Sequence, residues 1–167
     1  EFDRVVGKLV RAKRIYILGV RSSSFLAGYL NFYFHLIFEN VTLVQSAAGE
    51  IFDQMLRIGP GDVLLAIGFP RYSKLTMSAV HFARDRGAEV IAITDSKMSP
   101  LYTLSVASLL VHCEMISFVD SMAAPVSLLN ALIVAVGKQK SAETAETFAE
   151  MERVWSRYEI FGYEDDE

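Results

Sequence analysis

The chain of 167 residues contains one cysteine, Cys113, so it cannot form an intrachain disulfide bond. A chain of this length can bury a hydrophobic core without covalent cross-links, and the shortage of cysteine favours a reducing compartment. Residues 1–14 mix charged and apolar side chains, which is not the pattern of a signal peptide. We therefore expect a cytoplasmic location.

Clusters of basic residues are also missing. The chain has 16 Lys and Arg against 20 Asp and Glu, with a net charge of −4 and a pI near 5.4. Binding to nucleic acid depends on neutralising phosphates, so this composition argues against direct binding of DNA or RNA by this chain.

Long apolar runs are absent as well. The three longest uncharged segments are residues 22–38, 98–113 and 121–137, and each contains polar residues or proline. A membrane-spanning helix needs about 20 predominantly apolar residues. We expect buried helices and strands here, and no membrane partner.

Several cofactor motifs are missing too. The sequence has no G-x-G-x-x-G fingerprint, no G-K-[ST] phosphate loop and no G-x-S-x-G nucleophile elbow. It has no His/Cys spacing typical of a metal site. We expect no cofactor and no bound metal.

What the sequence does contain is a regular alternation of strands and helices, with 52% hydrophobic residues. Continuously apolar strand interiors indicate a parallel sheet covered on both faces. The prediction is an α/β fold: a three-layer αβα sandwich around a five-stranded parallel sheet, with the flavodoxin-like strand order 2-1-3-4-5. We expect strands at residues 15–18, 41–44, 63–67, 89–94 and 106–112, and helices at 2–10, 22–38, 48–57, 73–86, 118–138 and 142–158.

Polar loops follow three of these strands. In such sheets a ligand binds beyond the carboxyl ends of the strands where the strand order reverses, here between strands 1 and 3. Hydroxyls, backbone N–H groups and arginines at helix starts suit an anion. Each serine could instead be a plain N-cap, and each arginine a surface or interface ion pair. The predicted ligand-binding residues are Arg21, Ser22, Ser23, Arg71, Tyr72, Ser73, Thr94, Asp95 and Ser96, with Gly19 and Glu50 as further candidates.

Four segments carry a family resemblance: RIYILGVRSSSFLA at 14–27, GDVLLAIGFPRYSKLT at 61–76, AEVIAITDSKMSPL at 88–101 and SFVDSMAAPVSLLNALIVAV at 117–136. The chain resembles the sugar isomerase (SIS) domain, in the form found in RpiR/MurR-type bacterial transcription regulators. The resemblance implies a non-catalytic domain that senses a phosphosugar and works as a dimer. It also implies a DNA-binding helix-turn-helix N-terminal to it in the full-length protein, a segment that this chain does not contain. We expect one SIS domain at 1–160, comprising a leading helix at 1–13, a core at 14–140 and a closing helix at 141–158, with an acidic tail at 159–167.

The two crevice loops depart from the family pattern. That pattern is roughly G-x-G-x-S after strand 1 and S-x-S-G-x-T after strand 3, so Ser23 matches its phosphate-contacting serine. Arg21 and Arg71 each stand where the pattern has glycine, and Gly68 and Pro70 replace hydroxyl residues. We expect the guanidinium groups to take over part of the anion binding, for a sugar phosphate or another acidic sugar derivative. The alternative is that the arginines fill the pocket.

Catalytic relatives isomerise sugar phosphates by moving protons, which requires a positioned base. The candidate bases are His35, Glu50, His81, His112 and Glu114. None of them stands in the predicted crevice with a clear partner, so we assign no catalytic residue. An aldose–ketose isomerase is the alternative function, and a structural module with an inactive site is a third.

Two helices have more apolar surface than one sheet can cover. Residues 22–38 carry six aromatic side chains that project in nearly every direction, and residues 121–136 are apolar all round. Either another helix of the same chain covers them, or the protein associates with itself. We expect a homo-oligomer, a dimer or a tetramer.

Overall fold

A five-stranded parallel sheet forms the centre of the computed structural model, which describes residues 1–45, 50–113, 115–116 and 118–161. The strand order is β2-β1-β3-β4-β5, as predicted, and every pairing within this sheet is parallel. β1 and β3 are buried along their whole length. The strands are β1 (Ile15–Gly19), β2 (Val41–Val44), β3 (Val63–Ile67), β4 (Glu89–Thr94) and β5 (Ala107–Leu110).

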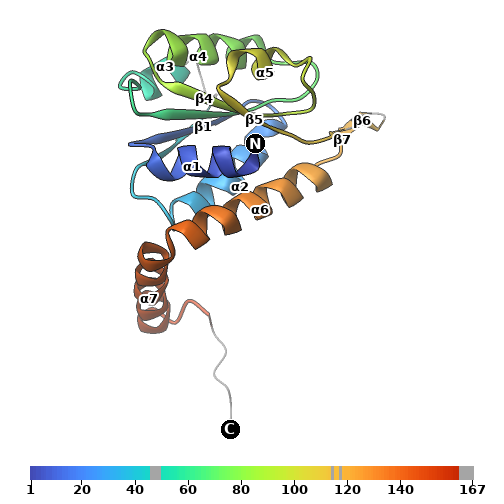
Figure 1. The fold of residues 1–167 in the computed structure, drawn as a ribbon. Helices are drawn as coiled ribbons and strands as arrows, with labels where there is room; N and C mark the ends of the chain where they lie inside the picture. The colour runs from blue at the N-terminus through green and yellow to red at the C-terminus, as the bar shows by residue number, and fades with distance from the viewer. Residues whose placement is uncertain (46–49, 114, 117, 162–167) are drawn as a thin grey trace.

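Helices cover both faces of the sheet, which gives the predicted three layers (Figure 1). One face carries α1 (Phe2–Arg11), α2 (Ser23–Phe34) and α6 (Ala123–Gln139). The other carries α3 (Ile51–Gln54), α4 (Lys74–Asp85) and α5 (Pro100–Leu104). Successive strand residues point to opposite faces, so β1, β2, β3 and β4 contribute to two separate core clusters, whereas β5 contributes only to the first. In β1, Ile15 and Ile17 belong to the first cluster, and Tyr16 and Leu18 to the second.

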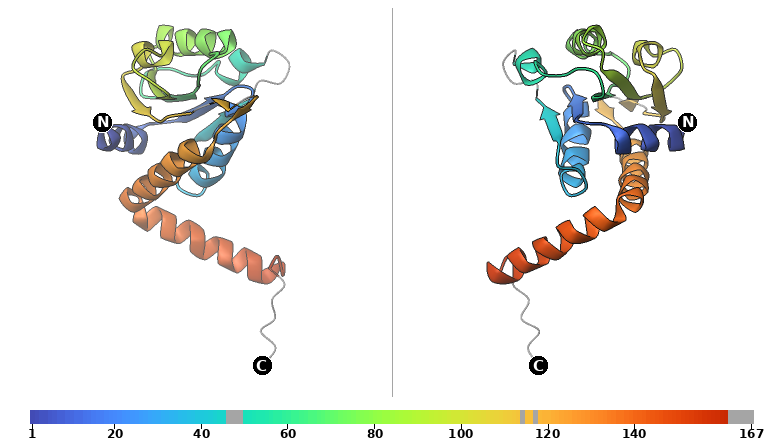
Figure 2. Two further views of the ribbon diagram at one scale, coloured as in Figure 1. Left: turned by 90° about the vertical axis from the view of Figure 1, so that its right-hand side faces the viewer. Right: turned by 60° about the vertical axis from the view of Figure 1, so that its left-hand side comes forward.

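The last helix, α7 (Ser141–Arg157), extends away from this body (Figure 2). None of its side chains is buried, and its main neighbour is α6. α6 lies against both α1 and α2, so part of the apolar surface of α2 and α6 is buried within the chain. None of the helices in the described part of the chain is long and apolar enough to cross a membrane.

Three predicted helices are shorter in the structure. The helix expected at 22–38 ends at Phe34, because the chain then turns and buries Ile37 and Phe38 on its way to β2. Of the helix expected at 48–57, only Ile51–Gln54 is helical, and residues 48 and 49 lie outside the described residues. The helix expected at 118–138 begins at Ala123.

Two elements were not predicted. The residues before α6 form a short antiparallel hairpin of β6 (Met115–Ile116) and β7 (Val119–Asp120). The polar loop after β4 ends in the short helix α5, because the Ser99 side chain caps it and Pro100 suits the first helical position.

Candidate functional site

A hollow of about 300 Å³ lies at the carboxyl ends of β1 and β3, where the sequence predicts the ligand crevice. The chain leaves β1 into α2 on one face of the sheet and leaves β3 into α4 on the other, so the two loops part and leave space between them. The hollow is lined by Val20, Arg21, Ser22, Ser23, Ile67, Gly68, Phe69, Pro70, Arg71, Ser73, Thr76 and Asp120.

Two twelve-residue helices, α2 and α4, begin at this hollow. The partial positive charge of each helix N-terminus favours an anion between them. Ser73 caps α4, and its hydroxyl accepts a hydrogen bond from the Leu75 N–H at 3.2 Å. Ser22 occupies the corresponding position of α2, but its side chain makes no such bond. The N-cap reading therefore holds for Ser73 and not for Ser22.

Both arginines of the hollow have a left-handed backbone. The φ angle is 59° at Arg21 and 65° at Arg71. Glycine adopts this region freely, whereas other residues pay about 1–2 kcal/mol. These are the two positions where the family pattern has glycine. The loops thus keep the backbone that glycine normally provides while carrying a guanidinium at each bend.

Gly19, the last residue of β1, is required for a different reason. A Cβ atom at this position would lie 2.2 Å from the Ser23 carbonyl oxygen, so only glycine lets α2 begin this close to the strand. Gly19 does not itself line the hollow. Its contribution is to hold the first turn of α2 against the end of β1.

Asp120 lines the hollow from outside the sheet, the two crevice loops and the helices that follow them. It ends the β6–β7 hairpin, and its Oδ2 atom accepts a hydrogen bond of 2.8 Å from the Ser22 hydroxyl. The hollow is thus lined by two cations and one carboxylate. Asp120 was not among the predicted site residues, because a helix was expected at 118–138. The available signal was a lone carboxylate in the otherwise uncharged run 115–137.

Beside the hollow lies a hydrogen-bonded cluster that joins the loops after β3 and β4. The Tyr72 hydroxyl donates to Asp95, and the Thr94 hydroxyl lies 3.2 Å from the same carboxylate and 2.8 Å from Ser99 Oγ. Burial raises the pKa of Tyr72, and the hydrogen bond to Asp95 acts in the same direction. Burial alone would raise the pKa of Asp95, but the hydrogen bonds from Tyr72, the backbone, Thr94 and Ser96 outweigh it and lower that pKa. Asp95 is thus a carboxylate at neutral pH, and its hydrogen bonds fix the third loop.

The structure therefore divides the predicted site residues into two groups. Those that line the hollow are Arg21, Ser22, Ser23, Arg71 and Ser73. Those that do not line it are Gly19, Glu50, Tyr72, Thr94, Asp95 and Ser96. Glu50 is exposed at the start of α3 and makes no side-chain capping bond.

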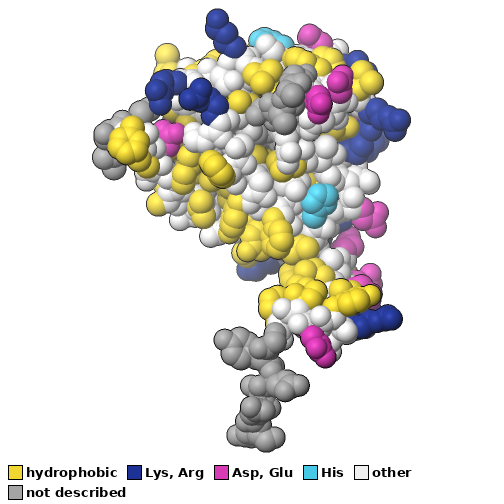
Figure 3. All heavy atoms as spheres, turned by 180° about the vertical axis from the view of Figure 1, so that it is seen from behind, with side chains coloured by type: hydrophobic (Ala, Val, Ile, Leu, Met, Phe, Trp, Pro, Cys, Tyr) yellow, Lys and Arg dark blue, Asp and Glu magenta, His cyan; other side chains and the backbone are white. Residues whose placement is uncertain are grey.

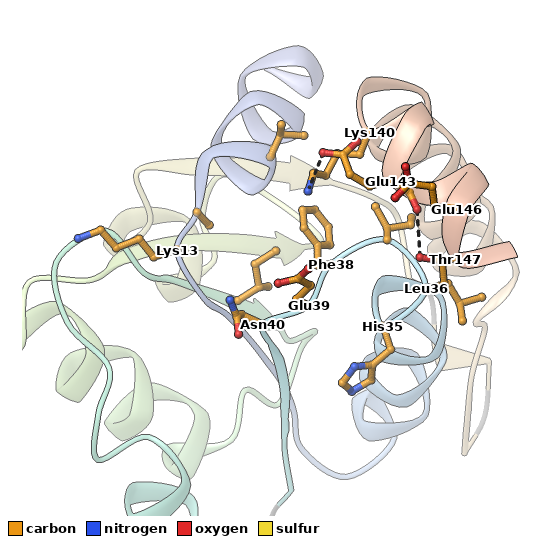
Figure 4. Close-up of a pocket in the computed structure, with 14 residues that line it drawn as sticks. Lys13, His35, Leu36, Phe38, Glu39, Asn40, Lys140, Glu143, Glu146 and Thr147 are labelled. Atoms are coloured by element: carbon orange, nitrogen blue, oxygen red, sulfur yellow. Dashed lines mark hydrogen bonds and ion pairs between the residues drawn. The ribbon is translucent and has the colours of Figure 1, made fainter. Parts of the chain in front are cut away.

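The candidate bases lie elsewhere. His81 is exposed on α4, and His112 is exposed after β5. Glu114 lies outside the described residues. His35 lines a second hollow of about 420 Å³, between the body and the start of α7 (Figure 4). Among the described residues, no group of three or more His, Cys, Asp or Glu side chains could hold a metal ion.

That second hollow is poorly suited to an anion. Lys140 and Glu143 lie side by side at the start of α7 and form an ion pair of 3.4 Å (Figure 4). Glu39 and Glu146 add further negative charge to the lining. The hollow between β1 and β3 is therefore the better anion site.

A parallel sheet in the order β2-β1-β3-β4-β5, covered on both faces by helices, defines the class of three-layer α/β domains. Within that class, residues 8–135 match the family model described as the SIS domain. The chain belongs to the SIS domain family. No curated protein sequence matches it.

Solved structures with the same fold include a domain of a transcription factor and a protein with an inferred isomerase function. The sugar isomerase domain of an RpiR transcription factor from Sphaerobacter thermophilus is 19% identical, with a TM-score of 0.85 over 91% of this chain and 85% of that one. The Vibrio vulnificus NanR protein, solved with ManNAc-6P, is 21% identical, with a TM-score of 0.79 over 94% of this chain and 60% of that one. MJ1247 from Methanococcus jannaschii, whose structure led to an inferred 3-hexulose-6-phosphate isomerase function, is 14% identical, with a TM-score of 0.59 over 90% of this chain and 77% of that one. At these identities the likeness establishes the fold alone.

Proposed function

We propose that this chain is the effector-binding domain of a bacterial transcription regulator and that it binds a phosphorylated sugar, or a related acidic sugar derivative, in the hollow between β1 and β3. The observation that carries the proposal is the convergence of two helix N-termini and two arginines on one hollow. A phosphate group there would meet backbone N–H donors and guanidinium forks, both of which favour anions. The NanR relative, whose structure contains ManNAc-6P, supports this class of ligand.

We also propose how this domain is placed in the full-length regulator. Residues 1–160 act as one SIS domain, with an acidic tail at 159–167, in a cytoplasmic protein. DNA is contacted only through a helix-turn-helix N-terminal to this domain. The domain forms a homo-oligomer, so that a bound ligand can change the relative position of two DNA-binding units. The exposed aromatic residues of α2 support self-association, since Phe25 is 80% exposed and Phe32 is 61% exposed in the single chain.

An aldose–ketose isomerase is the second candidate, and one observation favours it. Asp120 places a carboxylate in the hollow, and a carboxylate can act as a general base. Two observations speak against an isomerase: Asp120 already accepts a hydrogen bond from Ser22, and no histidine lines the hollow in the described part of the chain. A sensor must bind its ligand without converting it. The two arginines that line the hollow suit the binding of an anion, whereas proton transfer would depend on Asp120.

The first experiment measures thermal unfolding in the presence of hexose 6-phosphates, including ManNAc-6P, and of their neutral parent sugars. A compound at 100 times its Kd should stabilise the fold by about 2.7 kcal/mol. We expect stabilisation by phosphorylated compounds only. NMR spectra of the stabilising compound with the protein should show no conversion over hours, whereas an isomerase would convert it.

The matched variants are Arg71→Gly and Arg84→Gly. Glycine at 71 removes the guanidinium while keeping the left-handed backbone, and it should weaken binding about tenfold to a hundredfold. Arg84 lies in the last turn of α4, far from the hollow, so its removal should leave the affinity unchanged. Equal responses from wild type and Arg71→Gly would contradict the role of the arginines, and no response to any anion would contradict the proposed function.

A further inference from the structure

The carboxylate of Asp120 lines a hollow whose other charged lining residues are Arg21 and Arg71. It reaches this position through the β6–β7 hairpin, in which Asp120 pairs with Met115 across the two strands. Its partner Ser22 is 98 positions away in the sequence and belongs to the loop after β1. An acidic side chain opposes the binding of a bare anion, so its presence in this hollow needs a reason.

The hydrogen bond between Ser22 and Asp120 restricts what each group can do. A serine hydroxyl has one proton, and here that proton is donated to Asp120 Oδ2. An ionised carboxylate is only an acceptor, with room for several donors on its two oxygens. Ser22 uses one acceptor site of Oδ2, and a carboxylate has about four such sites, so Asp120 can accept further donors. The carboxylate thus offers the hollow an acceptor, beside loops that offer donors and positive charge.

We propose that Asp120 forms a second subsite in this hollow, which accepts hydrogen bonds from the hydroxyl groups of the same molecule whose phosphate is held by the arginine loops. This inference rests on the proposed function and adds the basis of specificity. The subsite selects molecules that carry an anionic group and hydroxyl donors together. A phosphate without a sugar part is disfavoured, because it meets the repulsion of the carboxylate without the hydrogen bonds that sugar hydroxyls return. Asp120 is in this sense a specificity-determining residue.

The test compares two dissociation constants by isothermal titration calorimetry, one for a hexose 6-phosphate (ManNAc-6P, glucose 6-phosphate or fructose 6-phosphate) and one for inorganic phosphate. The ratio of the two constants measures selectivity for the sugar part. In Asp120→Asn the charge and one acceptor are lost with little change of shape. We expect affinity for the hexose 6-phosphate to fall at least about tenfold, and affinity for inorganic phosphate to stay the same or rise.

The control is Asp85→Asn, which makes the same change of charge at the far end of α4 and should leave the ratio unchanged. A second variant, Ser22→Ala, removes the hydroxyl that partly neutralises the carboxylate. It should weaken the binding of inorganic phosphate more than that of the hexose 6-phosphate, so the ratio moves in the opposite direction. This variant also tests the inference if Asp120→Asn does not fold.

The outcomes separate the two proposals. If the hexose 6-phosphates bind and Asp120→Asn leaves the ratio unchanged, or weakens both ligands equally, the inference about Asp120 is wrong and the proposed function stands. If wild type binds inorganic phosphate and hexose 6-phosphates equally well, the inference is also wrong. If wild type binds none of these compounds, the proposed function fails and the inference fails with it.

Discussion

At the scale of single residues, the backbone of Arg21 is the most informative feature. Its φ angle of 59° lies in the left-handed region, as does that of Arg71 at 65°. Such strain persists only where the surrounding structure enforces it, and it is found preferentially at functional sites. A glycine would occupy either position without cost. An arginine in each place therefore favours a role for the side chain itself.

This strain makes a prediction about stability. Replacing Arg21 with glycine should give a protein about 1 kcal/mol more stable than replacing it with alanine, because only glycine adopts this backbone freely. Urea unfolding of both variants measures the difference. At Ser78, exposed in the middle of α4, the order should reverse for the glycine and alanine variants, because glycine is about 1 kcal/mol worse than alanine inside a helix. An Arg21→Ala protein as stable as Arg21→Gly would mean that the left-handed backbone is absent in solution.

At the scale of elements, the short helix α5 depends on tertiary contacts rather than on helix propensity. It has five residues, too few for a stable isolated helix. Its cap, Ser99, is completely buried, and its hydroxyl oxygen accepts from the Leu101 N–H at 3.2 Å and from the Thr94 hydroxyl at 2.8 Å. Through Thr94 and Asp95 this cap is connected to Tyr72, in the loop beside the hollow.

The Ser99 cap should therefore contribute measurably to the free energy of unfolding. Ser99→Ala removes the acceptor for two donors, and we expect it to lower the free energy of unfolding by about 1–2 kcal/mol. Ser78 is exposed on α4, and Ser78→Ala should change stability by less than about 0.5 kcal/mol. Urea denaturation followed by circular dichroism compares the two. Equal effects would show that the Ser99 network adds nothing to stability.

At the scale of the whole molecule, one face remains rich in exposed apolar side chains. Figure 3 shows hydrophobic groups gathered on this face and continuing onto α7. Large exposed hydrophobic residues occur on α2, α6 and α7, namely Phe32, Val134 and Phe148. Such a surface is typical of a protein interface.

We expect the chain to form a dimer or a larger oligomer through these helices. Phe32→Glu places a charge in that interface and should raise the dissociation constant at least about tenfold, as measured by sedimentation velocity. Met98 is 91% exposed in the loop after β4, and Met98→Glu should leave association unchanged. A wild-type chain that stays monomeric at every concentration would contradict the prediction.

The sequence by itself determined the sheet and the place of the crevice. The predicted bounds of β2, β3 and β4 agree with the structure. Buried parallel strands are short apolar runs ended by polar or turn residues, so the signal is local. The strand order was adopted from flavodoxin-like folds with the same alternation of strands and helices, and that order places the loops of Arg21 and Arg71 together. The sequence also showed that Arg21 and Arg71 stand at glycine positions of the family pattern. It did not show that both residues keep a left-handed backbone.

Only the tertiary structure decided which polar groups share the hollow. Asp120 comes from a hairpin with two residues in each strand, too short to leave a periodic pattern in the sequence. Its contact with Ser22 joins positions far apart in the chain, and nothing in either local segment predicts it. The hydrogen bond between Tyr72 and Asp95 also joins two loops that are separate in the sequence, and Thr94 bonds to the same carboxylate. Periodicity and local motifs report on neighbours along the chain, whereas these contacts depend on how distant elements are packed.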